Sequence, residues 1–216
     1  MATQTLAQPR EDVAANPKVQ QIVEAARRLF MADGYGATSM DAIARDAGVS
    51  KATLYAHFTN KAELFAAIIG GECQRFAHLL WSPEAESGDV RSVLLQLARA
   101  KVQFTRSPEP RAIYRIVVGE SGRFPELGRV FYENGPRRVL ERVAGYLRDA
   151  TAKGLLNVPH PRLAAEQLFG MVHGADHLRR LLGVDDPNAP DVDQIVDSAV
   201  DVFLDAYGPA GRAPNG

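Results

Sequence analysis

The sequence predicts an all-α fold, and two observations lead to this prediction. Apolar residues recur at intervals of three and four positions through most of the chain, which is the spacing of one face of a helix. The stretches between these patterns are short and rich in Gly, Pro, Ser and Asp, as at 82–89, 107–110, 119–125 and 183–190. We therefore expect a series of helices joined by short loops.

Composition bounds the class of protein. The chain has 216 residues, of which 46% are hydrophobic and 24% charged, with a formal net charge of −1. A general positive field for nucleic acid is therefore excluded, and any such contact must be local. A single cysteine, Cys73, excludes an intramolecular disulfide, and neither a membrane span of about 20 apolar residues nor a secretory signal is evident. We expect a cytoplasmic protein with no membrane partner.

The first predicted helix is Val19 to Gly34. Its apolar stripe is typical of a core helix. The stripe consists of Val19, Ile22, Ala26, Leu29 and Phe30. Residues 1–17 before it are expected to form a flexible arm, from which Arg10 could reach a minor groove. Arg27 and Arg28 lie off the stripe and could meet DNA, but two basic residues on a helix are more often a solvated face.

Residues Ser39 to Lys61 show a helix-turn-helix pattern. Met40, Ile43, Ala44 and Ala47 recur at helical spacing, Gly48 permits a positive φ at the helix end, and Ser50 can cap the next helix. In that second helix Leu54 and Phe58 are four apart and face inward. The outward residues are small, hydrogen-bonding or cationic, as the major groove requires. They are Lys51, Ala52, Thr53, Tyr55 and His57.

The stretch TSMDAIARDAGVSKATLYAHFTNK resembles the signature of the TetR family of bacterial transcriptional regulators. The resemblance implies that Thr38 and Ser39 donate to a phosphate at a helix N-terminus, and that Tyr55, His57 and Lys61 also bind phosphates. It places Lys51, Ala52 and Thr53 at base edges of an operator in double-stranded DNA. A simpler role for Thr38, Ser39 and Asn60 is helix capping. Asn60 and Glu63 have the spacing of a capping box.

The middle of the chain is expected to hold helices at 60–80 and 90–105, with the SPEP sequence at 107–110 ending the second. A short helix, a Gly-rich break at 119–125 and a long helix reaching Ala152 follow, and Pro136 should kink or interrupt the long helix. The segment ESGRFPELGRVFYENGP is similar to the ligand-binding domain of the AefR-like branch of the TetR family. We expect domains at 18–65 and 66–208, with a disordered tail at 209–216.

Two helices, at about 161–183 and 190–207, close the chain, and each is apolar on two neighbouring faces. One apolar face of such a helix packs in the core of its own chain, and the second face is expected to contact a partner. The family resemblance implies that this partner is the same helix pair of a second subunit, as in a homodimer. The expected interface consists of Met171, Ala175, Leu178, Ile195, Ala199, Val202 and Phe203.

Aromatic and polar residues beyond the helix-turn-helix predict a small-molecule effector site. The resemblance favours a repressor that binds a palindromic operator and is released by a small apolar or amphipathic ligand. The candidate ligand-binding residues are Phe104, Arg115, Phe131, Phe169, His173 and His177, with Trp81, Tyr114, Met171 and Glu120 as further candidates. Each aromatic or bulky candidate taken alone is more often an ordinary core residue, and Arg115, Glu120 and His173 could instead form helix-end ion pairs. The alternative is a constitutive DNA-binding regulator whose second domain only dimerises.

The spacing of His173 and His177 is also compatible with a metal site in an enzyme. No glutamate stands in an H-E-x-x-H arrangement, and no third ligand is evident in the sequence. Neither a nucleophile elbow nor a phosphate-binding Gly-rich loop appears. We therefore expect a regulator with no cofactor and no catalytic or metal-ligating residues.

Overall fold

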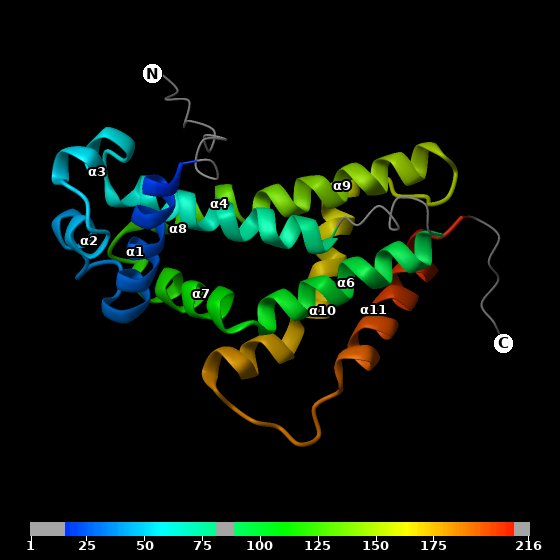
Figure 1. Cartoon of the computed structure of the whole chain (residues 1–216). Helices are drawn as coiled ribbons and strands as arrows, with labels where there is room; N and C mark the ends of the chain where they lie inside the picture. Colours follow the sequence, from blue (N-terminus) through cyan, green and yellow to red (C-terminus); the bar gives the residue numbers. More distant parts are fainter. Residues whose placement is uncertain (1–15, 81–88, 210–216) are drawn as a thin grey trace. The chain divides into compact units, whose positions relative to one another are not determined.

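The structure, a computed structural model, describes residues 16–80 and 89–209, without the side chains of 77–80. Arg10 and Trp81 lie outside these ranges, as do nearly all of the expected arm, the loop at 82–89 and the tail. All secondary structure in the described ranges is helical (Figure 1). None of these helices combines the length and hydropathy of a membrane span.

The helices follow the expected order along the chain. They are α1 (Pro17–Asp33), α2 (Met40–Asp46), α3 (Lys51–His57), α4 (Lys61–Leu80), α6 (Val90–Arg106), α7 (Pro108–Glu120), α8 (Pro125–Asn134), α9 (Pro136–Ala152), α10 (Pro161–Leu182) and α11 (Val192–Tyr207). Five of them begin at a proline. Proline has no backbone N–H, but the N–H groups of a helix's first turn have no partner within the helix, so proline costs little there. The predicted interruption at Pro136 is confirmed, because α8 ends at Asn134 and α9 begins two residues later.

The α10 helix is not the continuous helix that its apolar pattern predicts. Gly174 has φ 27° and ψ −144°, outside the helical region, and Figure 1 shows the helix turning sharply along its length. A positive φ of this kind favours glycine, which has no Cβ to clash with the backbone. The sequence showed Gly174 on the expected helix, but an isolated glycine does not by itself predict a break.

The chain divides into two compact units that do not follow a single cut after residue 65. The first unit combines Met1–Cys73 with Ala112–Pro136, and the second combines Gln74–Arg111 with Arg137–Gly216. We call these the first and the second unit. Helices α4 and α7 each contribute residues to both units.

The core of the first unit explains why it includes a distant segment. Helices α1 to α4 and the segments that join them supply most of the core, including Phe30, Ile43 and Leu54. Four buried residues of α7 and α8 complete the same cluster: Ile113, Val117, Leu127 and Val130. Because burying an apolar side chain contributes about 1.5–3 kcal/mol, α7 and α8 help to stabilise the same folded unit as α1 to α4.

One carboxylate fixes the turn that follows α1. Glu120, the last residue of α7, accepts hydrogen bonds from the backbone N–H groups of Tyr35 and Gly36, both at 2.6 Å. A Cβ on Gly36 would lie 2.9 Å from Glu120 Oε2 and 3.0 Å from the Phe124 ring, so glycine leaves room for this contact. Charge-assisted bonds of this kind are roughly twice as strong as neutral ones.

The same turn is held from its other side by Lys61 of α4. Its Nζ donates to the Tyr35 carbonyl oxygen at 2.7 Å and lies 4.6 Å from the centre of the Tyr35 ring. Burial lowers the Lys61 pKa, while the charge of Glu120 opposes that change. Burial also raises the pKa of the Tyr35 phenol to about 12. We call Glu120, Lys61 and the backbone of Tyr35 and Gly36 the Glu120 clamp.

In the second unit, α6 packs against α10 and α11. Its apolar face contributes Leu94, Leu97 and Ala98 to the interior. Arginines along α6 pair with carboxylates of α11, as Arg99 does with Asp193 at 3.2 Å and Arg91 does with Asp201. The α11 helix begins with a capping box formed by Asp191 and Gln194.

Substituting Glu120 by Ala should lower the free energy of unfolding by about 2–4 kcal/mol, because two N–H groups lose a charged acceptor. Urea denaturation followed by circular dichroism measures this change. Glu126→Ala is the matched control. Glu126 acts on Lys61 and Tyr35 only through its charge. We expect it to change stability by about 0.5 kcal/mol or less. Equal losses in both variants would contradict the role of the clamp.

Candidate nucleic-acid interface and ligand site

Local hydrogen bonds position α3. Gly48, with φ 66°, turns the chain between α2 and α3. Ser50 then caps α3 by accepting from the Thr53 N–H at 3.0 Å, as the sequence predicts. Leu54 and Phe58 are buried, so the opposite face of this short helix is turned outward.

The outward face of α3 displays the side chains expected at DNA. Lys51, Ala52 and Tyr55 are exposed, and Thr53 and His57 are half-buried. Tyr55 keeps 49% of its surface accessible, so its phenol can reach a partner. We call these five residues the α3 surface. Ser39 is exposed at the start of α2, where its hydroxyl accepts from the Ala42 N–H at 3.1 Å.

Two of the polar groups on the α3 surface already have partners. Lys51 Nζ lies 2.5 Å from Asp41 Oδ2, and the hydroxyls of Thr53 and Ser50 are 2.8 Å apart. Both residues of the ion pair are exposed, and exposed ion pairs contribute little to stability. Lys51 can therefore exchange Asp41 for an acceptor on DNA at small cost.

Two residues expected at phosphates, Thr38 and Lys61, contact the turn after α1. Thr38 is only 3% exposed, and its hydroxyl donates to the carbonyl oxygens of Gly34 and Leu29. Lys61 belongs to the Glu120 clamp, where its ammonium is bound to Tyr35. Both side chains hold the turn after α1, and the phosphate roles that the family resemblance implies for them stay predictions.

The predicted pairing of Asn60 with Glu63 is shifted by one residue. Asn60 Oδ1 accepts from the Glu63 N–H at 3.0 Å, as expected. The Glu63 carboxylate, however, accepts from the N–H and the hydroxyl of Thr59 rather than from Asn60. Thr59 and Asn60 thus share the start of α4.

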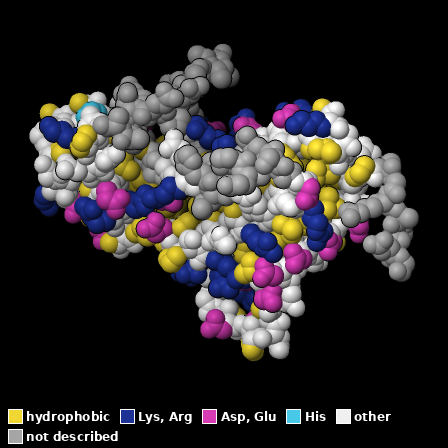
Figure 2. All heavy atoms as spheres, turned by 45° about the vertical axis from the view of Figure 1, so that its right-hand side comes forward, with side chains coloured by type: hydrophobic (Ala, Val, Ile, Leu, Met, Phe, Trp, Pro, Cys, Tyr) yellow, Lys and Arg dark blue, Asp and Glu magenta, His cyan; other side chains and the backbone are white. Residues whose placement is uncertain are grey.

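The arginines of α1 are engaged within the first unit. Arg27 lies 3.1 Å from Glu72 of α4, and Arg28 lies 2.7 Å from Asp46 at the end of α2. On the face that Figure 2 shows, basic and acidic side chains are interspersed. This distribution agrees with the net charge of −1. Any contact with DNA must therefore be local, and the α3 surface is the candidate for it.

The expected ligand-binding residues are divided between the two units. Phe131 and Arg115 belong to the first, where the Phe131 ring centre lies 6.0 Å from that of Tyr114 and Arg115 is exposed. Phe104 belongs to the second unit and stacks on Phe76 at 4.4 Å. Glu120, expected as a polar contact for a ligand, is instead part of the clamp.

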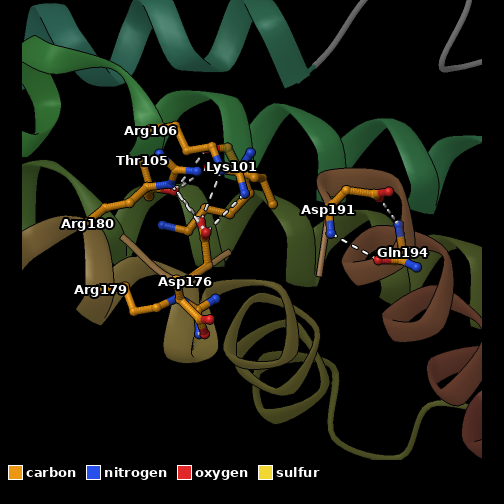
Figure 3. Close-up of polar contacts among 10 residues, drawn as sticks. Lys101, Thr105, Arg106, Asp176, Arg179, Arg180, Asp191 and Gln194 are labelled. Atoms are coloured by element: carbon orange, nitrogen blue, oxygen red, sulfur yellow. Dashed lines mark hydrogen bonds and ion pairs between the residues drawn. The ribbon is translucent and has the colours of Figure 1, made fainter. Parts of the chain in front are cut away.

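The remaining candidates gather between α6 and α10 in the second unit. The ring centres of His173 and His177 are 3.8 Å apart. Beside them Asp176 accepts two hydrogen bonds from Arg106, both at 3.0 Å, and also pairs with Arg180 (Figure 3). These arginine contacts lower the Asp176 pKa against the opposing effect of burial.

Lys101 of α6 also belongs to this region, and sequence reasoning missed it. The signal was present: Lys101 follows Leu94, Leu97 and Ala98 at helical spacing, so it lies on the apolar stripe of α6. Lysine at such a position is uncommon, because burial penalises its charge. Across the described part of the chain, no three His, Cys, Asp or Glu residues are grouped to hold a metal ion.

The expected interface residues differ in accessibility. Met171, Ala175, Leu178 and Val202 are exposed, with Leu178 at 56% and Val202 at 53%. Ala199 and Phe203 are buried in the core of their own unit and are not available to a second subunit. The apolar pattern of the sequence showed that α11 has two apolar faces, but it did not show which face is buried and which is exposed. Leu163 and Leu182, both exposed, extend the apolar surface along α10.

Comparisons with known sequences agree with this geometry. Residues 22–68 match the profile of the bacterial regulatory proteins of the tetR family, and residues 92–209 match the AefR-like transcriptional repressor C-terminal domain. The HTH-type transcriptional regulator TtgR of Pseudomonas putida is 39% identical over 82 residues, which cover 36% of this chain and 39% of TtgR. UidR of Escherichia coli is 30% identical over 65% of this chain and 69% of its own length.

Solved structures extend the likeness to nearly the whole chain. The Flavonoid-responsive Regulator FrrA is 39% identical, covers 90% of this chain and 98% of its own, and superposes with a TM-score of 0.78. A TetR-family regulator from Mesorhizobium loti is 31% identical over 88% of this chain and 96% of its own, with a TM-score of 0.75. With both profiles matched and the helix-turn-helix in place, the chain belongs to the TetR family of transcriptional regulators, which are not enzymes.

Proposed function

We propose that this regulator binds a palindromic operator as a homodimer, represses transcription from it, and leaves it when a small amphipathic ligand binds the second unit. The α3 surface is the observation that supports DNA binding most directly. It presents a lysine, a threonine, a tyrosine and a histidine around two buried anchors, Leu54 and Phe58. Selection of bound sequences from a random DNA library tests this part of the proposal.

Phosphate and base contacts divide along α3. Tyr55 and His57 are at the end of the helix and are proposed to bind phosphates together with Ser39, whereas Lys51, Ala52 and Thr53 at its start face base edges. Lysine at a base edge discriminates by donating to guanine acceptors. The ion pair with Asp41 holds Lys51 at the start of α3 until DNA replaces the carboxylate.

The proposed dimer uses the exposed apolar residues of α10 and α11. Leu163, Met171, Leu178 and Val202 are candidates, because each exposes at least 37% of its surface in the single chain. A twofold dimer presents two α3 helices, which must be about 34–36 Å apart to enter successive major grooves. The operator is then a palindrome with the same symmetry.

An effector changes operator affinity only if it binds one spacing of the two α3 helices better than another. FrrA is described as flavonoid-responsive, and its similarity over 90% of this chain favours an aromatic, amphipathic effector here. The Glu120 clamp gives the response a mechanical basis, because α7 shares residues with both units while its last residue holds the turn after α1. Coupling energies between such sites are about 1–3 kcal/mol, so operator affinity should fall roughly 5- to 150-fold.

The constitutive alternative, in which the second unit only dimerises, predicts no such change. A screen of aromatic amphipathic compounds separates the two, with the melting temperature reporting binding and fluorescence anisotropy of a labelled operator reporting release. A compound that raises the melting temperature and releases the operator supports the repressor. Binding without any effect on operator affinity would favour the alternative.

Tyr55→Phe should weaken binding to every DNA sequence by a similar factor, roughly 5- to 30-fold, because it removes a hydrogen bond to a charged phosphate. Lys51→Ala should instead change the preferred base at one operator position, by about 1–3 kcal/mol. Operator titrations over a panel of single-base variants measure both effects. Tyr132→Phe, an exposed tyrosine of α8, is the control. Loss of base preference in Tyr55→Phe with none in Lys51→Ala would reverse the assignment.

Val202→Glu should convert the dimer to monomers, since an exposed apolar side chain in the proposed interface gains a charge that lacks a partner. Light scattering at micromolar concentration measures the molar mass. Asp201→Asn on the neighbouring exposed position of α11 is a control that should remain dimeric. A stable monomer in the unsubstituted protein would contradict the proposed dimer.

A further inference from the structure

Lys101 is a charged residue in an apolar position. It is on the inward stripe of α6, and its Nζ lies 5.6 Å from the centre of the Phe169 ring of α10, which is buried. Burial lowers the pKa of the Lys101 ammonium to about 8. Lys101 is half-buried, and at pH 7 the group remains mostly protonated, so a positive charge lies beside an aromatic face.

The carboxylates of the neighbouring elements are paired with arginines. Asp176 of α10 is shared by Arg106 and Arg180, and Asp193 of α11 lies 3.2 Å from Arg99. Figure 3 shows Arg106 and Arg180 converging on Asp176, with Lys101 beside them on α6. Within the described residues, no ion pair or side-chain hydrogen bond joins the Lys101 ammonium to an acid. The region around α6 and α10 therefore has an excess of positive charge.

The two histidines next to Lys101 are uncharged at pH 7. Burial and the Lys101 charge lower the pKa of His173 to about 4, and burial and Lys101 also lower that of His177. A neutral imidazole has one donor and one acceptor nitrogen, so the pair can hydrogen-bond to a polar group without adding charge. Their rings are in contact, so the two imidazoles lie side by side and can bind the same group.

The break at Gly174 separates these groups along α10. His173 precedes the non-helical residue, whereas Asp176 and His177 follow it. The segment after the break is tied to α6 by the two hydrogen bonds from Arg106 to Asp176. A shift of either half of α10 at Gly174 therefore changes the distance between the histidines and α6.

We propose that Lys101, His173 and His177 form an anchor for an amphipathic anion, and that the effector of this regulator is an apolar molecule with one carboxylate or ionised phenol. The inference rests on the proposed ligand-responsive function and specifies the chemical class of the ligand. The acidic group binds the Lys101 ammonium and the imidazoles, and the apolar body contacts Phe169. An anion at this position compensates a charge that the fold leaves without a carboxylate.

Two fluorescent probes with the same aromatic body test the anchor. Anilinonaphthalene sulfonate carries one anionic group, and phenylnaphthylamine carries none. Each is titrated against the full-length protein and against Lys101→Met, which keeps an unbranched apolar side chain but loses the charge. Lys101→Arg retains the charge, and Lys153→Met removes an exposed lysine as the control.

Lys101→Met should weaken the sulfonate probe roughly 10- to 100-fold, because a charge-assisted contact is lost. The neutral probe should change by about twofold or less. Lys101→Arg should retain most of the affinity, and Lys153→Met should equal the unsubstituted protein. Since Lys101→Met removes a desolvated charge, its melting temperature should be no lower than that of the parent. Equal loss of both probes, or no saturable binding of the sulfonate, overturns the anchor.

A second measurement does not depend on any variant. An anion next to Lys101 raises the pKa of its ammonium, so binding of the sulfonate probe at pH 8 should take up protons. Calorimetric titrations in two buffers of different ionisation enthalpy measure this uptake. Binding without proton uptake at that pH contradicts the contact with Lys101.

Measuring operator affinity with each probe separates a failure of the proposed anchor from a failure of the proposed ligand response. If the neutral probe alone releases the operator and Lys101→Met responds normally, the regulator is ligand-responsive and the anchor is wrong. If the sulfonate probe binds through Lys101 and operator affinity does not change, the anchor stands and the ligand-responsive function fails. Competition of the bound probe by naphthoate or by decanoate then identifies aromatic acids or fatty acids as the source of the anion.

Discussion

Two backbone N–H groups in the turn after α1 depend on a carboxylate more than eighty residues further along the chain. The contacts from Glu120 to Tyr35 and Gly36 are charged, partly buried and short, at 2.6 Å each. Removing the carboxylate would leave two donors without their acceptor, which is more costly than never forming the bonds. Lys61 holds the carbonyl side of the same turn, so α4 and α7 fix it together.

This constraint determines what the DNA-binding segment consists of. The turn leads directly into α2 and α3, and the buried residues of α7 and α8 complete the core beneath them. The α3 surface is therefore supported by helices from the middle of the chain, not only by its own neighbours. In a family whose members regulate transcription, a change that reaches α7 has a direct structural route to the helix that is proposed to read DNA.

Local features were predictable from the sequence, and distant contacts were not. The helix-turn-helix, the Ser50 cap and the interruption at Pro136 follow from spacing, capping and proline geometry within a few residues. The roles of Thr38, Lys61 and Glu120 depend on a shared turn whose members are far apart in sequence, so no local pattern could assign them. Lys101 was detectable as a lysine on an apolar stripe, but its neighbours on α10 depend on the break at Gly174.

Native-state amide hydrogen exchange on the unsubstituted protein tests the central claim most directly. If the Glu120 clamp joins the turn to α7, the Tyr35 and Gly36 amides should open with the same free energy, and the same denaturant dependence, as the interior amides of α7 and α8. Such behaviour identifies one cooperative unit. Exchange of the Tyr35 and Gly36 amides at a markedly lower free energy, while α7 and α8 stay protected, would show that the turn opens independently and would contradict the account.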